Sequence, residues 1–167
     1  MKSFFQKRSI ENNINIEPNE TEKVNKAKPL IIDGLTQEMT FFHDEFKVDD
    51  KSTKLTLSVC SKSSGKPVGK LHFNFGDNVL AHRISNNSIV TTIEDIILEF
   101  MDNNPDYVAG APILMTESEF LDWYIKTYRE TNCQNIVHFF VYSVEYYYEF
   151  ILNALPEITF IKNEDRF

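Results

Sequence analysis

The chain has 167 residues, of which 42% are hydrophobic and 25% charged, and its formal net charge is −8. This composition indicates one globular domain, large enough to close a hydrophobic core without a metal or a disulfide. Five glycines and six prolines exclude a collagen-like or broadly low-complexity chain, and the apolar content excludes a wholly disordered one.

The excess of negative charge lies in the second half of the sequence. Residues 1–93 carry 13 basic and 11 acidic residues, whereas residues 94–167 carry 4 basic and 14 acidic ones, a net charge of −10. Such a segment repels phosphate backbones, which argues against direct nucleic-acid binding, and attracts basic partners. The plainer alternative is that the acidity serves only solubility.

The beginning of the sequence is polar and predicts a flexible N-terminal arm over residues 1–28, followed by one folded domain over residues 29–167. Residues 1–13 contain no apolar run long enough for a signal-peptide core, and residues 131–144 are too short and too polar to span a membrane. The two cysteines, Cys60 and Cys133, form no Cys-x-x-Cys pair. We therefore expect a cytoplasmic protein that does not insert into membranes.

Residues 39–75 have the pattern of β-strands. Residues 39–43 predict a strand covered on both faces, and residues 54–61 alternate apolar and polar side chains. Gly65 and Pro67 supply a turn, after which Leu71, Phe73 and Phe75 share one face. We predict an antiparallel hairpin over Leu55–Phe75 with one apolar face.

The period then changes to that of helices. Thr91 and Glu94 have the spacing of a capping box before an apolar stripe that ends at Pro105. A second box at Thr116–Glu119 predicts a longer helix to about residue 131. Its expected buried face consists of Phe120, Leu121, Tyr124, Ile125 and Tyr128.

The last quarter allows two interpretations. Residues 136–141 are typical of a buried strand and residues 145–155 of a helix ended by Pro156, although one continuous helix through both is the alternative. Residues 158–161 predict a short strand. Together these elements predict an α+β or mixed α/β fold: a single domain with an antiparallel sheet packed by about three helices.

Catalytic and cofactor motifs are not found in the sequence. It has no Gly-x-Ser-x-Gly elbow, no phosphate-binding glycine loop and no His-x-x-x-His pair, so we expect no enzyme activity and no cofactor. The four histidines, His43, His72, His82 and His138, leave open a metal site assembled from distant residues.

Acidic and aromatic residues are the features from which a binding surface can be predicted. Four carboxylates, Glu94, Asp95, Glu117 and Glu119, lie in first helical turns, where the helix dipole explains them. Consecutive tyrosines at 146–148 on a helix cannot all face inward, so at least one is expected at the surface. The predicted partner-binding residues are Glu99, Asp102, Asp106, Asp122, Glu145, Tyr147 and Glu149.

In size, acidity and Asn/Ile/Lys-rich composition, the sequence resembles the immunity proteins of bacterial contact-dependent growth inhibition and related polymorphic-toxin systems. The resemblance runs from the KLTLSVC and KLHFNF strands to the PILMTESEFLDWY helix entry. It implies an inhibitor that binds a basic cognate toxin, often a nuclease, and blocks its active site or substrate groove. Some such proteins also pair a β-element with the toxin. The resemblance assigns no role to any individual residue.

Two other functions are compatible with the same sequence. One is a DNA-mimic inhibitor of the antirestriction type, although a charge of −8 over 167 residues is modest for a phosphate mimic. The other is a small metal-dependent hydrolase that uses His72 or His82.

Overall fold

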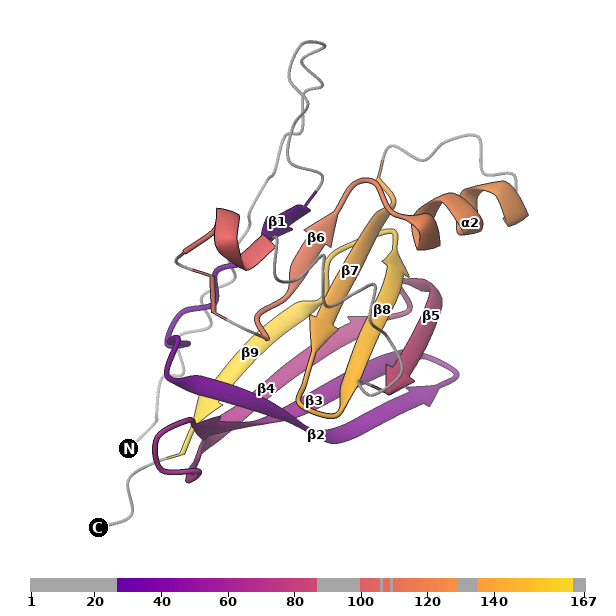
Figure 1. Ribbon diagram of the computed structural model, residues 1–167. Helices are drawn as coiled ribbons and strands as arrows, with labels where there is room; N and C mark the ends of the chain where they lie inside the picture. Colours follow the sequence, from indigo (N-terminus) through magenta and orange to yellow (C-terminus); the bar gives the residue numbers. More distant parts are fainter. Residues whose placement is uncertain (1–26, 87–99, 106, 109, 129–134, 164–167) are drawn as a thin grey trace, which may run out of the picture.

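Two antiparallel β-sheets pack face to face in the computed structural model, which describes residues 27–86, 100–105, 107–108, 110–128 and 135–163 (Figure 1). The five-stranded sheet has the order β1 (Ala27–Pro29), β6 (Ile113–Met115), β7 (Val137–Tyr142), β8 (Tyr146–Leu152), β5 (Val79–Asn86). The four-stranded sheet has the order β2 (Met39–Asp49), β3 (Ser52–Ser61), β4 (Pro67–Gly76), β9 (Glu157–Lys162). Outside the sheets, the described helical segments are residues 100–103 and α2 (Glu119–Tyr128).

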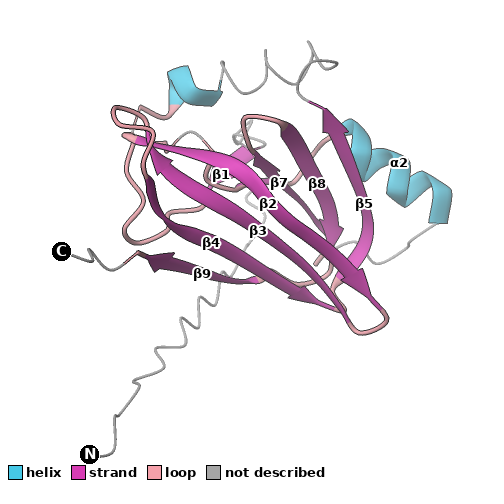
Figure 2. Ribbon diagram, turned by 90° about the horizontal axis from the view of Figure 1, so that it is seen from below, coloured by secondary structure: helices cyan, strands magenta, loops and turns pink. Residues whose placement is uncertain are grey.

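The predicted hairpin over Leu55–Phe75 is confirmed as β3 and β4. Leu55 lies opposite Phe73 and Leu57 opposite Leu71, and their side chains are fully or almost fully buried. The alternate residues of both strands lie on the outer face, which the described residues leave open to solvent (Figure 2). Gly65 adopts the left-handed conformation that the connecting turn requires.

The main hydrophobic core lies between the two sheets. Leu57, Phe73 and Phe75 from the four-stranded sheet meet Phe139 and Phe150 from the five-stranded sheet. The Phe75 and Phe150 ring centroids are 4.3 Å apart, and Phe139 meets Phe73 and Phe75 edge to face. Aromatic rings therefore supply much of the contact between the two layers.

The predicted α+β fold with about three helices is wrong, because the protein is mainly antiparallel β-structure with short helices. Residues 146–152, expected to form the third helix, form β8. Both faces of this strand are covered, so its residues are buried without the polar–apolar alternation that reveals a strand. For the same reason Tyr147 and Tyr148 are both buried, contrary to the expectation that a tyrosine here is exposed, and Tyr146 is half-buried.

Several predicted strands are confirmed, but the structure also contains strands that were not predicted. The strands expected at residues 136–141 and 158–161 are β7 and β9, and residues 39–43 begin the longer β2. The short strands β1 and β6 and the whole of β5 were not predicted. Of the predicted arm, residues 27–28 belong to β1, whereas residues 1–26 and the capping box at 91–94 lie outside the described residues.

Candidate functional site

Helix α2 lies on the outer face of the five-stranded sheet, on the side formed by β8 and the edge strand β5 (Figure 1). Phe120, Leu121 and Tyr124 are its buried residues, and they pack against Ile151 of β8. This apolar stripe confirms most of the predicted buried face. Tyr128, expected on that face, is 58% exposed.

The N-terminus of α2 is fixed by Ser118. Its hydroxyl oxygen accepts a hydrogen bond from the backbone N–H of Leu121 at 3.1 Å, as an N-cap residue does. The same hydroxyl lies 2.8 Å from Nδ1 of His138, which is almost fully buried on β7. Ser118 therefore joins the start of the helix to the sheet beneath it, and it takes the capping role that the sequence assigned to Thr116.

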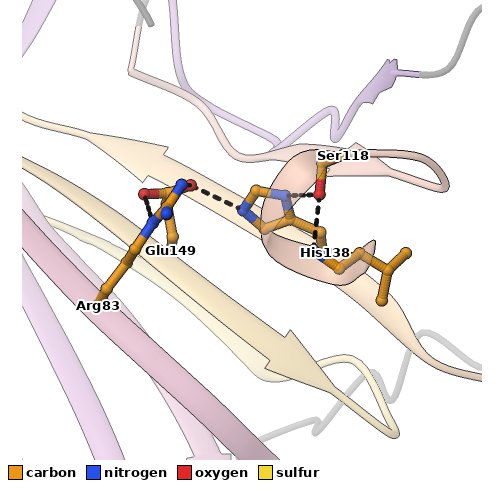
Figure 3. Close-up of polar contacts among 5 residues, drawn as sticks. Arg83, Ser118, His138 and Glu149 are labelled. Atoms are coloured by element: carbon orange, nitrogen blue, oxygen red, sulfur yellow. Dashed lines mark hydrogen bonds and ion pairs between the residues drawn. The ribbon is translucent and has the colours of Figure 1, made fainter. Parts of the chain in front are cut away.

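A buried carboxylate extends this contact into the sheet (Figure 3). Glu149 of β8 pairs with Arg83 of β5 through two hydrogen bonds, of which Nη2 to Oε1 measures 2.7 Å. His138 Nε2 lies 3.3 Å from the same Oε1, within ion-pair distance, although it makes no hydrogen bond among the described residues. The chain Ser118–His138–Glu149–Arg83 thus crosses from α2 through β7 and β8 to β5.

The electrostatics of Glu149 follow from this arrangement. Burial by itself raises the pKa of its carboxyl, but His138 and the Arg83 guanidinium outweigh that effect and hold the pKa below its ordinary value. A carboxylate that is paired in two directions is a weak proton acceptor. A hydroxyl, an imidazole and a carboxylate follow one another as in a catalytic relay, and because the Ser118 hydroxyl also caps α2, the same contacts hold the helix against the sheet.

The outer side of α2 presents aromatic residues to solvent. Trp123, the one tryptophan of the sequence, is 49% exposed and stacks on the buried Phe120 with centroids 5.6 Å apart. Tyr128 meets the indole edge-on at 6.4 Å. Exposed tryptophan and tyrosine in contact with each other are typical of the centre of a protein–protein interface.

Residues 100–103 and α2 with the residues before it cover different parts of the outer face of the five-stranded sheet, and together they are called the helical layer here. The exposed acidic side chains in the described part of residues 100–128 are Asp102, Glu117, Glu119 and Asp122. Lys126 is the one basic residue in that same described part. The four-stranded sheet and its turns are different, because they carry several lysines, among them Lys54, Lys62 and Lys70. Those lysines balance the acidic residues of the same sheet, such as Asp44 and Asp49, so a net negative charge remains over the helical layer.

The structure does not bring the predicted partner-binding residues together. Tyr147 and Glu149 are each 2% exposed and lie beneath the helical layer, so neither belongs to an open surface. Glu145 lies in the β7–β8 turn, where its carboxylate accepts a hydrogen bond from the backbone N–H of His43. Asp102 and Asp122 are exposed, and Glu99 and Asp106 lie outside the described residues.

The histidines lie at separate places in the structure. His72 contacts Thr56 on the outer face of the four-stranded sheet, His82 packs against Phe46, and His43 Nδ1 lies 2.7 Å from the Tyr148 hydroxyl. The described residues contain no group of three side chains able to hold a metal ion. Cys60 is a free, half-buried thiol, and Cys133 lies outside the described residues.

Glu149 was predicted as a surface residue, but neither its pairing with Arg83 nor the exposed Trp123 was predicted from the sequence. Arg83 and Glu149 are 66 residues apart, and nothing local indicates their pairing. A signal for Trp123 was present, because it follows Phe120, Leu121 and Asp122 at a position that helical periodicity places outside the apolar stripe.

Comparisons of the chain with protein-family models, with curated proteins and with solved structures gave no match. Within the described residues no helix has the length and apolar character needed to cross a membrane.

Proposed function

We propose that this protein is an inhibitor that binds a basic protein through the outer side of α2, and that the partner is a cognate toxin. The observation that carries the proposal is the half-exposed Trp123, in contact with Tyr128 and flanked by Glu119 and Asp122. Aromatic anchors bury a large area at little entropic cost, and surrounding carboxylates select a positively charged partner.

Electrostatic steering supports the same surface. Residues 94–167 carry a net charge of −10, and the described acidic residues of the helical layer are exposed. A concentration of one sign of charge raises the rate of encounter with an opposite charge, and this effect falls as salt is added. Capture of the partner is therefore fast at low ionic strength and is completed by packing of the two rings.

The toxin part of the proposal comes from the resemblance to immunity proteins. A nuclease holds its substrate on a basic surface, so an acidic surface of this kind competes with nucleic acid for the same groove. Inhibition then needs binding alone, without an enzyme activity or a cofactor of its own. We place this encounter in the cytoplasm.

The experiment uses the full chain, tagged, as bait in an extract of the source organism. We expect one basic protein to co-purify at equal stoichiometry, to be lethal when expressed alone and to be harmless when both are expressed together. Many weak DNA-binding partners would favour the DNA-mimic function instead. Recovery of no stable partner, or of a harmless one, would contradict the toxin proposal.

A charge-reversal pair locates the surface. Glu119→Lys with Asp122→Lys should lower the association rate constant by about tenfold at low salt. The matched control is Asp33→Lys with Asp50→Lys, which reverses two exposed charges outside the helical layer. Equal effects of the two pairs would show that net charge, and not this surface, controls association.

A further inference from the structure

Trp123 is 49% exposed, and its indole is stacked against the buried Phe120 ring. Phe120 stacks on it with an angle of 14° between the ring planes, and in the described residues no other ring stacks parallel to it. Tyr128 stands at 90° to the indole and is itself fixed by Tyr124, whose ring centroid lies 4.8 Å away. The two exposed rings therefore form an ordered corner on the surface of α2.

Directly beneath this corner the protein already holds a guanidinium between an aromatic ring and a carboxylate. The Arg83 guanidinium carbon lies 4.5 Å from the Phe120 ring centroid, while Glu149 pairs with the same guanidinium. The surface beside Trp123 offers the same two components, because Glu119 precedes Trp123 by four residues and so shares its side of the helix. Asp122, the residue before Trp123, adds a second exposed carboxylate.

We propose that Trp123, with the Glu119 carboxylate on the same side of α2, binds an arginine side chain of the basic partner. This proposal rests on the proposed function for the identity of the partner but names the chemistry that α2 recognises. A planar guanidinium stacks on an indole and still donates hydrogen bonds to carboxylates at its edge. A lysine ammonium matches this site less well, because it is more strongly hydrated and cannot pair with a carboxylate through two parallel hydrogen bonds.

The test uses the full chain and needs no toxin. Because Trp123 is the one tryptophan, its fluorescence reports directly on the site during a titration with acetyl-Arg-Arg-Arg-amide. The control peptides are the tri-lysine and the uncharged tri-citrulline analogues. We expect a saturable change in emission, with arginine binding more tightly than lysine and citrulline producing no saturation. Equal responses to all three peptides, or a response that never saturates, would overturn the proposal.

Variants separate ring stacking from charge. Trp123→Phe keeps a ring and should retain part of the affinity measured by calorimetry, whereas Trp123→Ala should lose it. Glu119→Gln should weaken arginine binding severalfold, and the control Asp50→Asn should leave it unchanged. Far-UV circular dichroism verifies that each variant is folded, which the exposure of these side chains favours.

The two proposals fail in different ways. A captured toxin that binds Trp123→Ala and the unchanged protein equally well would refute the arginine site and leave the inhibitor function standing. Selective arginine-peptide binding without any toxin partner would refute the toxin proposal and support the site. With a captured toxin, we expect Trp123→Ala to weaken binding by about 30-fold, as for a central aromatic anchor.

Discussion

The ion pair between Arg83 and Glu149 can be tested by removing each partner in turn. The two side chains differ in their access to water, because the side chain of Glu149 is 3% exposed and that of Arg83 is 47% exposed. Arg83→Met leaves a carboxylate confined under α2, with His138 as its remaining ionisable neighbour. Glu149→Gln leaves a guanidinium that can turn toward solvent. We therefore expect the arginine variant to be the less stable of the two.

The magnitudes follow from the same difference in exposure. Leaving a buried charge without its partner costs about 3 kcal/mol, the lower end of the usual range, because His138 is still close to Glu149. Replacing Glu149 by glutamine costs about 1–2 kcal/mol, since the solvated guanidinium loses mainly a charged hydrogen bond. In the double variant the two losses overlap, and the coupling energy should be about 1.5 kcal/mol or more.

Urea unfolding at pH 7, followed by far-UV circular dichroism, measures all four proteins of this cycle. Additive effects, with a coupling energy below about 0.5 kcal/mol, would refute the pairing. A larger loss for Glu149→Gln than for Arg83→Met would refute the argument from exposure.

The pH dependence gives the same pair a second test. Because the folded-state pKa of Glu149 is lowered from its ordinary value of 4.5, the unfolded chain binds a proton first as the pH falls. Its contribution to stability is therefore complete above that ordinary value and is lost as the pH falls through the lowered one. The stability difference between the unchanged protein and Glu149→Gln should be constant above about pH 5.5 and shrink below pH 4.5. A difference that grows on acidification would have the wrong sign.

Three further predictions concern the surrounding structure. Gly110 has a φ of +97°, and a Cβ there would lie 2.3 Å from the Phe41 ring, so Gly110→Ala should cost about 3 kcal/mol in urea unfolding. The control Gly65→Ala shares a positive φ but meets open space and should cost about 1 kcal/mol, so equal losses would contradict the steric argument. Ser118→Ala removes the N-cap of α2 and the partner of His138, so it should lower the free energy of unfolding by about 1–2 kcal/mol. The backbone amides of α2 should then exchange their hydrogens faster, and an unchanged exchange rate would contradict the anchoring role of Ser118. Burial raises the pKa of Tyr142 to about 12 and raises the pKa values of Tyr107 and Tyr148 further. In an absorbance titration at 295 nm, at least three of the seven tyrosines should therefore remain largely protonated at pH 11. Ionisation of all seven in the folded protein would contradict the burial of these three.

Alternation predicted β3 and β4 from the sequence, and a short β-branched and aromatic run predicted β7, whereas β8 was predicted as a helix and β5 was missed. β3 and β4 alternate because one face packs in the core and the other meets water. β8 has no such contrast, and its run of tyrosine, phenylalanine and isoleucine is compatible with a buried helix as well as a buried strand. Only pairing with β5 and β7 along its length decides that it is a strand.

In the candidate site too, some features could be predicted from the sequence and others depend on the tertiary structure. The sequence by itself determined the acidity of the second half, the helix that became α2 and its buried stripe of Phe120, Leu121 and Tyr124, because charge and helical period are local properties. The tertiary structure alone decided that Glu149 is buried against Arg83 while Trp123 and Tyr128 remain exposed. Whether a residue meets water or another side chain depends on which distant strand or helix covers it, and the spacing of residues in one segment does not contain that information.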